Sequence, residues 1–173
     1  AYLDKQHTYR SREEWSYHDY RNCDIINTIP AAEFLAAEGL WALRMGAIVE
    51  EPIESSHLRV IDYATKFRSD FADVYLTAHC KFCLGDTAGI VMLPIVFGVP
   101  CAITNITPLG YPTTRTAQDL FIPKKYRHIE SNRMLTFGEI IKIGADLWTD
   151  GHKFTDAGIA VVENTAEEIL DLA

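Results

Sequence analysis

Short apolar segments alternate with longer segments rich in Ala, Leu and Glu along most of this chain, and this alternation restricts the fold more than any other feature. The apolar segments have the length of strands and are hydrophobic throughout, as strands covered on both faces of a sheet are. Helices and strands in alternation predict a doubly wound α/β domain with a Rossmann-like parallel sheet. The predicted strands are residues 40–46, 58–63, 81–85, 100–105 and 158–163.

Capping residues mark the first two predicted helices. Thr28 can cap a helix that has Pro30 in its first turn and ends before Gly39. Ser69 or Asp70 can cap the next helix, whose apolar side chains recur at helical spacing and form one stripe. That stripe consists of Phe71, Val74, Tyr75 and Ala78.

The third predicted helix is apolar nearly all round, so we expect it to be buried. It would begin near Ala88 and end at Gly98. Pro94 would kink a helix of this length, because its ring clashes with the carbonyl four residues before it.

The segment 106–131 contains several prolines and reads as a long loop with one short strand near 120–123. A loop of this length in a compact domain is usually functional. Beyond it, capping boxes at residues 136–139 and 165–168 predict the starts of the last helices.

Charge and length limit the class of protein. Of the 173 residues, 16 are Lys or Arg and 24 are Asp or Glu, so the formal net charge is −8. This balance argues against a general nucleic-acid binder, although a local basic pocket could still hold one anion. No apolar run approaches the roughly 18 residues of a membrane span. Residues 2–21 are charged and aromatic, unlike a signal peptide, so we expect a cytoplasmic protein.

The length suits one domain with a sizeable core or a fragment of a two-domain protein. Residues 1–20 contain no strand that could start the sheet, and the last predicted helix runs to the end of the sequence. We therefore expect a single α/β domain over residues 1–173 that is a fragment of a longer enzyme.

The four cysteines do not form a recognisable metal site. Only Cys80 and Cys83 make a C-x-x-C pair, and neither Cys23 nor Cys101 completes a zinc pattern. The pair ends a predicted helix and enters a strand, whereas a thioredoxin-like pair precedes a helix. We expect buried, reduced thiols and no bound metal.

A small polar turn, Gly-Asp-Thr-Ala-Gly at residues 85–89, leads from a predicted strand into the third predicted helix. In a doubly wound sheet, ligands bind at the carboxyl ends of strands, beside helix N-termini. The N–H groups of Thr87, Ala88 and Gly89 would favour an anion such as a diphosphate, whereas Asp86 would suit a sugar hydroxyl. The motif matches neither G-x-G-x-x-G nor a Walker A loop, and taken alone it is better interpreted as a turn without a ligand.

Several separated motifs, in a fixed order, resemble a family of bacterial glycosyltransferases found with surface-carbohydrate genes. The turn and the helix after it are also distantly similar to the donor-binding lobe of heptosyltransferases, in which a D-T-G at a helix start meets the nucleotide-sugar phosphates. The motifs are R-N (21–22), G-x-x-x-x-R-M-G (39–46), D-Y (62–63), C-x-F-x-x-G-x-x-x-G (80–89), F-G-V-P (97–100) and DLFIPKKY (119–126).

The resemblance covers roughly residues 20–172 and implies the carboxyl-terminal lobe of a GT-B fold. That lobe binds a nucleotide sugar in a cleft that faces an amino-terminal lobe, which this sequence does not contain. The implied activity is transfer of a sugar from the nucleotide sugar to a surface-carbohydrate acceptor, with neither a metal nor a cofactor. The residues implied to hold the donor diphosphate are Gly85, Asp86, Thr87, Ala88 and Gly89.

Three further donor-binding candidates lie in the loop that the resemblance aligns with the first strand-helix turn and at the end of the first predicted strand. Arg21 and Asn22 precede the first helix, where an Arg could neutralise a diphosphate or simply be solvated beside acidic neighbours. Arg44 ends a buried strand and needs an anionic partner, which could be the ligand or an internal carboxylate such as Glu33 or Asp62.

The remaining candidates follow the next strands. Asp62 and Tyr63 lie where a base or ribose would bind, although Tyr63 could equally be ordinary packing. Asn105 could reach a sugar hydroxyl or serve to cap a turn.

The sequence supplies no catalytic base, because its His residues are scattered and no Ser-His-Asp or H-E-x-x-H arrangement occurs. No D-x-D motif occurs either, so a metal-bound donor is not indicated. In inverting GT-B enzymes the base generally comes from the amino-terminal lobe. Two other functions stay open: a nucleotide-sugar epimerase of the same fold, and a non-catalytic α/β module whose loop 106–131 binds a partner protein.

Overall fold

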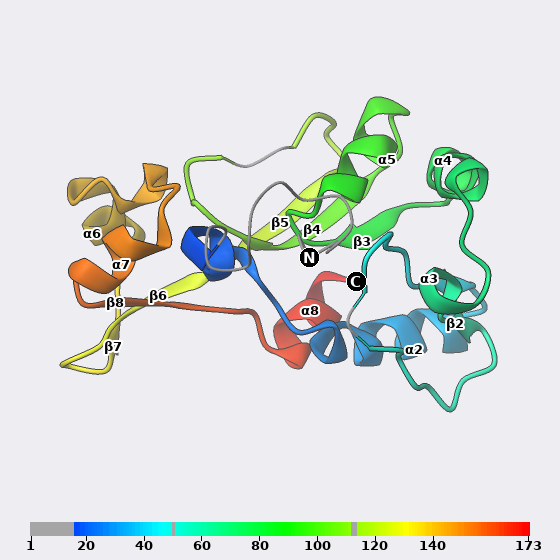
Figure 1. The fold of residues 1–173 in the computed structure, drawn as a ribbon, viewed down its shortest axis with the longest axis horizontal. Coiled ribbons are helices and arrows are strands. Elements are labelled where there is room, and N and C mark those ends of the chain that lie inside the picture. Colours follow the sequence, from blue (N-terminus) through cyan, green and yellow to red (C-terminus); the bar gives the residue numbers. More distant parts are fainter. Residues whose placement is uncertain (1–15, 50, 112–113) are drawn as a thin grey trace.

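The computed structural model describes residues 16–49, 51–111 and 114–173 and has a mixed α/β fold with small parallel sheets (Figure 1). The predictions that fall on residues 1–15 lie outside the described residues. The described helices include no segment long and apolar enough to cross a membrane.

Two of the sheets are parallel, as the apolar segments predicted. Strand β1 (Ala42–Leu43) pairs with β2 (Val60–Ile61). Strands β3 (Cys83–Gly85), β4 (Cys101–Ile106) and β5 (Leu120–Pro123) form a three-stranded sheet in that order. Every residue of β4 is buried, because β4 lies between two strands.

The third sheet is antiparallel and differs from the prediction. Strand β6 (Lys125–His128) lies between β7 (Arg133–Met134) and β8 (Ile159–Val162). The strand predicted at 158–163 therefore forms but does not join a parallel sheet. Segment 106–131 was predicted as mostly loop but contributes β6 as well as β5. The sequence did not reveal β6, because this strand is short and polar and has no apolar pattern.

The helices begin close to the predicted capping residues. Ser69 caps α4, and both predicted capping boxes form at Thr136 and Thr165. The Thr28 side chain makes no capping bond, and Asp24 instead caps the 3₁₀ turn before it. The helical segments are η1 (Ser16–Arg21), η2 (Ile25–Thr28), α2 (Ile29–Ala37), α3 (Tyr63–Lys66), α4 (Asp70–His79), η3 (Gly89–Val91), α5 (Met92–Val96), α6 (Phe137–Lys142), η4 (Ala145–Leu147), α7 (Gly151–Asp156) and α8 (Ala166–Leu172).

The apolar segment after the turn is shorter and less buried than predicted. A 3₁₀ turn, η3, comes first, and the α-helix begins only at Met92. Pro94 is then the third residue of α5. The N–H groups of the first turn of a helix have no intrahelical acceptor, so the absence of an N–H at Pro94 removes no helical hydrogen bond. Pro94 and Ile95 are buried, but Val96 is 74 % exposed.

The apolar stripe of α4 faces outward. Phe71 is 78 % exposed and Tyr75 51 %, whereas the polar Asp73 and Thr77 are buried. Asp73 accepts a hydrogen bond from the Tyr63 hydroxyl (3.1 Å) and pairs with Arg68 (2.9 Å), so this polar face is satisfied internally. Helical periodicity located the stripe correctly but could not show which way it faces.

Two separate apolar cores support the sheets. One lies between the parallel sheet and the helix after the turn, and the other lies under the antiparallel sheet. The first contains Val91, Ile95, Cys101, Ile103 and Ile106, and the second contains Tyr126, Ile140, Ala145, Phe154 and Ile159. The described strands thus form three small sheets rather than one continuous sheet, and each of the two larger sheets packs on one of these cores.

Asp119 ties the loop before β5 to the start of β4. Its carboxylate accepts hydrogen bonds from the backbone N–H groups of Cys101 (3.0 Å), Arg115 (2.7 Å) and Thr116 (2.8 Å). Partial burial acts to raise the pKa of Asp119, but these bonds outweigh it and lower the pKa to about 2. The ionised carboxylate therefore stabilises the fold above its unfolded pKa of about 3.9, and this stability is lost as the pH falls through about 2.

Replacing this carboxylate should weaken the fold at neutral pH. We expect Asp119→Asn to lower the free energy of unfolding at pH 7 by about 1 kcal/mol, because the bonds to a charged acceptor become weaker. Between pH 4 and pH 2 the variant should lose less stability than the parent, which denaturant titrations across that range would measure. Asp156→Asn, at an exposed carboxylate of α7, is the control. Identical acid sensitivity of parent and Asp119→Asn would contradict this role.

Candidate functional site

The turn at residues 85–89 lies at the carboxyl end of β3, at the edge where β4 and β5 also end. Asp86 folds back, and its carboxylate accepts a hydrogen bond from the Ala88 N–H (2.7 Å). That N–H is therefore not available to a ligand. Within the described part of the chain, the N–H groups of Thr87 and Gly89 have no acceptor.

The two glycines of the turn have different roles. A Cβ at Gly85 would come within 2.9 Å of the Val91 side chain, so Gly85 is required by packing. A Cβ at Gly89 would meet no described atom within 4 Å. The space beside Gly89 is open to a ligand, and a side chain there would occupy it.

A segment from far earlier in the sequence covers this edge of the sheet. The Arg21 guanidinium donates to the Thr87 carbonyl (2.8 Å), which places a cation beside the turn. Asn22, predicted to contact the donor, directs its side chain to Asp19 (3.1 Å) at the surface. The structure therefore brings Arg21 to the turn and leaves the Asn22 side chain bonded elsewhere.

Cys23 and Lys124 are part of the same arrangement and were not predicted from the sequence. The Cys23 thiol donates to the Asp86 carboxylate (2.8 Å), and burial, together with Asp86, raises the pKa of that thiol well above its usual range. Lys124 is 4 % exposed, and its ammonium donates to the carbonyls of Tyr20 (3.1 Å) and Asn22. Burial lowers the pKa of Lys124. The available signal in the sequence was the position of Lys124 directly after the short strand predicted near 120–123.

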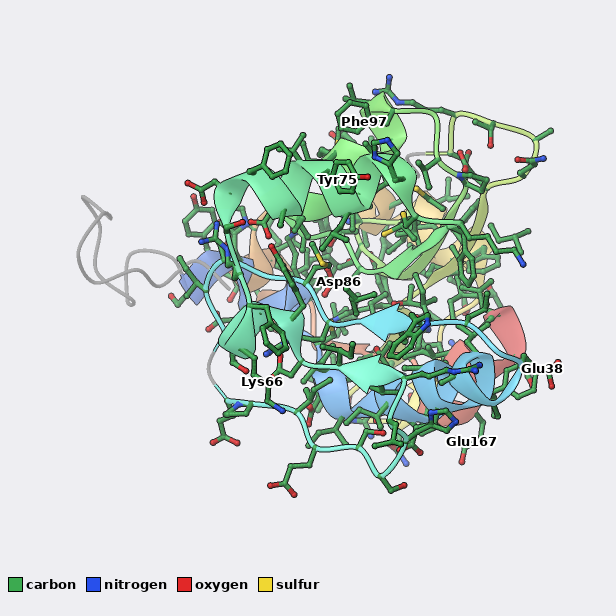
Figure 2. The ribbon with its side chains drawn as sticks, turned by 90° about the vertical axis from the view of Figure 1, so that its right-hand side faces the viewer. Glu38, Lys66, Tyr75, Asp86, Phe97 and Glu167 are labelled. Carbon is green, nitrogen blue, oxygen red and sulfur yellow. The ribbon has the colours of Figure 1, made fainter. Side chains whose placement is uncertain are left out.

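Lys124 fixes the segment that carries Arg21, because it holds the carbonyls on both sides of that residue. Its charge is partly balanced by Asp86 and Glu163, which both favour its protonated form. Asp86, labelled in Figure 2, is half-buried, and its carboxylate belongs to this network because it accepts from both the Cys23 thiol and the Ala88 N–H.

Asn105, the last of the predicted donor-binding residues in the sequence, lies near the carboxyl end of β4 and is 2 % exposed. Its backbone N–H donates to the Asn164 side chain (2.6 Å), and its own side chain accepts from the Asn164 N–H (2.7 Å). Asn164 also donates to the Pro123 carbonyl (2.9 Å). Asn105 has a φ of 55°, a left-handed conformation that Asn tolerates better than most residues. This pair joins β4 to the segment after β8.

Arg44 and Asp62 bind each other. The Arg44 guanidinium lies 3.1 Å from the Asp62 carboxylate, and the two side chains are 10 % and 1 % exposed. Asp62 also accepts from the Thr65 hydroxyl (2.6 Å) and the Ile53 N–H (3.1 Å). Burial acts to raise the pKa of Asp62, but these bonds and Arg44 outweigh it and lower that pKa. Of the partners considered for Arg44, the internal carboxylate Asp62 is the one observed.

Tyr63 is 4 % exposed and holds the start of α4. Its hydroxyl lies 3.1 Å from both the Asp73 carboxylate and the Ser69 carbonyl, which share its one proton, and it accepts from the Ser69 N–H (3.0 Å). The packing interpretation of Tyr63 therefore accounts for all of these contacts. With Arg44 and Asp62, it belongs to the β1–β2 side rather than to the turn.

All four cysteines are free thiols, and only Cys101 is fully buried. Cys83 and Cys101 are register partners on β3 and β4, and burial raises their pKa values to about 12 and about 11. Burial also raises the pKa of Cys80. These thiols are therefore protonated at neutral pH. In residues 16–49, 51–111 and 114–173, no group of three or more His, Cys, Asp or Glu side chains is arranged to hold a metal ion.

Two open hollows occur elsewhere on the molecule. One of about 420 Å³ has mostly apolar walls beside the antiparallel sheet, including Trp148 and Ile159. The other, of about 530 Å³, lies between α2 and residues 56–59. Neither includes a residue of the turn.

Comparison with models of protein families, with curated proteins and with solved structures found no match to this chain.

Proposed function

We propose that this chain is the donor-binding lobe of a glycosyltransferase and that it holds a nucleotide sugar by its diphosphate at residues 85–89. The observation that supports the proposal most directly is the geometry of this turn. Among the described residues, the backbone N–H groups of Thr87 and Gly89 have no acceptor, no atom lies within 4 Å of a Cβ at Gly89, and the Arg21 guanidinium bonds to the Thr87 carbonyl. Phosphate binding requires this combination of backbone donors, close approach and a cation.

In this proposal the turn stabilises the negative charge that develops on the diphosphate as its bond to the sugar breaks. Breaking the bond between sugar and diphosphate places negative charge on the phosphate oxygens, and fixed N–H donors stabilise that charge. Arg21 is held in position by its neighbours' bonds to Lys124, so it supplies positive charge with little reorganisation. Among the described residues its guanidinium donates to the Thr87 carbonyl, and a phosphate oxygen beside the turn would be a stronger, charged acceptor.

The proposal includes the finer features that the family resemblance implies. These are a doubly wound, GT-B-type lobe, an amino-terminal lobe outside this sequence, and a carbohydrate acceptor bound between the two lobes. The parallel order β3–β4–β5, with the turn at the carboxyl edge, is compatible with such a lobe. The catalytic base would come from the other lobe, so this chain alone should bind the donor and transfer no sugar.

Calorimetric titration of the chain with UDP, GDP, ADP, CDP and TDP tests the proposal. We expect saturable binding of one of these nucleoside diphosphates, with weaker binding of the matching monophosphate because a phosphate contact is lost. Adding salt should reduce the affinity, since Arg21 contributes through its charge. The same titration identifies the base of the donor.

Absence of heat with all five nucleotides, from a sample whose folding is verified by circular dichroism, would overturn the donor site. A protein-binding module would give that result. An epimerase would bind nucleotide but would release epimerised sugar when the full-length enzyme is supplied with nucleotide sugar.

A further inference from the structure

The hollow of about 420 Å³ beside the antiparallel sheet has the features of a small-molecule site. We call it the Trp148 pocket. Its walls come from β6 and β8, from α6, and from residues that directly follow η4 and α7. Helices α6 and α7 lie over this sheet at the left of Figure 1. The volume is near the lower end of the range of roughly 300–1,000 Å³ for ligand pockets, so it suits a small molecule and not a protein segment.

The apolar walls of the Trp148 pocket are anchored in the second core. They are formed by Leu135, Ile143, Trp148 and Ile159. The Trp148 ring packs edge-on against Phe154 with the ring centroids 5.3 Å apart, and Phe154 is 2 % exposed. Walls held in this way are already ordered before a ligand arrives, which lowers the entropy cost of binding. The half-buried indole offers a flat face on which an aromatic ring can stack.

Two polar side chains of the pocket are donors. Lys142 is exposed, and its ammonium forms no ion pair or hydrogen bond within the described part of the chain. The His128 Nδ1 atom accepts from the Ser131 N–H (3.3 Å), so the neutral ring carries its proton on Nε2 and can donate there. The pocket therefore offers a positive charge and a ring N–H to a ligand.

The acidic side chain in the described lining, Glu139, is already paired. It accepts two hydrogen bonds from the Arg133 guanidinium (2.7 and 3.0 Å) and others from the Thr136 N–H (2.8 Å) and hydroxyl (3.0 Å). The bonds from Arg133, together with those from Thr136, lower the pKa of Glu139 to about 2. Glu139 and Arg133 thus cancel each other's charge, and Lys142 sets the sign of the pocket.

An apolar pocket with one uncompensated cation fits an anion that carries an apolar body. A phosphate group is usually held by several convergent donors, such as a row of backbone N–H groups, whereas one ammonium and one ring N–H suffice for a carboxylate. We propose that the Trp148 pocket binds a small aromatic carboxylic acid, with its ring against Trp148 and its carboxylate on Lys142. This site shares no residue with the turn and does not depend on the proposed donor site.

Calorimetric titration of the full chain with benzoate, phenylacetate and indole-3-acetate tests the proposal. We expect saturable binding of at least one of these acids at one site, with a Kd of about 0.1–1 mM, which is the affinity that so small a ligand allows. The amide of that acid has the same ring without the charge, and acetate has the charge without the ring. Each of these two controls should bind at least about 10-fold more weakly than the acid.

Lys142→Met should weaken binding of the acid at least about 10-fold and leave binding of its amide unchanged, because only the carboxylate loses its partner. Lys142 lies in the last turn of α6, where its charge also suits the helix C-terminus, so the melting temperature is measured alongside the affinity. Lys153→Met, at an exposed lysine of α7 outside the pocket, is the matched control and should bind the acid like the parent.

Three results would overturn the pocket. The first is no saturable binding of any of the three acids up to about 10 mM, by a chain whose folding is verified by circular dichroism. The second is equal affinity of the parent for the acid and for its amide, which would exclude a site for the carboxylate. The third is a Lys142→Met variant that binds the acid like the parent, since Lys142 would then serve only the end of α6.

Discussion

Gly89→Val should abolish nucleoside diphosphate binding, reducing affinity by at least about 100-fold, while leaving the melting temperature of the chain nearly unchanged. A valine side chain would fill the open space beside Gly89, where the proposed phosphate approaches the backbone. The protein itself tolerates the change, because a Cβ at Gly89 meets no described atom within 4 Å. Loss of binding without loss of stability is what a ligand site at the turn requires.

Two variants sharpen this test. Thr87→Ala removes one hydroxyl and should weaken binding by only about 1 kcal/mol. Gly138→Val makes the same substitution in α6, at another glycine with no described atom within 4 Å of a Cβ, and should change neither affinity nor fold. Calorimetric affinity and melting temperature would be measured for all three proteins. A Gly89→Val variant that binds nucleotide like the parent would exclude the turn as the phosphate site.

Asn164→Ala should be strongly destabilising, lowering the free energy of unfolding by about 3 kcal/mol. The Asn164 side chain is buried and bonds to the Asn105 N–H and the Pro123 carbonyl, at 2.6 Å and 2.9 Å. Its removal leaves a donor and an acceptor unpaired inside the protein, and each costs about 1–3 kcal/mol. For a domain of this size the melting temperature should fall by roughly 6–12 °C.

Asn22→Ala is the matched control for this variant. The Asn22 side chain is at the surface and bonds only to Asp19 among the described residues, so its loss should change stability by no more than about 0.5 kcal/mol. Denaturant titration of both variants at pH 7 provides the comparison. Equal stability of Asn164→Ala and Asn22→Ala would show that the Asn105–Asn164 pair does not hold the two sheets together.

The segments that form strands and helices could be predicted because their signals are local. Ser69, Thr136 and Thr165 each accept from an N–H group three residues later, so a short stretch of sequence contains both partners. The uniformly apolar strand at residues 100–105 likewise predicted a buried strand in a parallel sheet, and β4 is entirely buried. The turn at 85–89 was also found at the end of a parallel strand, as its position between two apolar segments indicated.

The residues that surround the turn could not be predicted, because they come together through contacts between segments far apart in the sequence. Lys124 holds carbonyls more than 100 residues earlier, and Asn105 pairs with Asn164, 59 residues later. Each residue type has many possible partners, and only the packing of the sheets selects one. Arg44 illustrates this, since the sequence offered both Glu33 and Asp62 and the structure selects Asp62.

The sequence by itself located the parallel strands and the caps at Ser69, Thr136 and Thr165, because these signals lie between neighbouring residues, but it missed β6 and the side-chain cap at Asp24. Only the tertiary structure decided which strands pair and which way each helix faces. The pairing of β8 with β6 in an antiparallel sheet and the outward stripe of α4 both follow from long-range burial. For α4, Asp73 and Thr77 are buried and Asp73 is paired with Tyr63 and Arg68, while Phe71 and Tyr75 are exposed, an orientation that depends on residues distant from the helix.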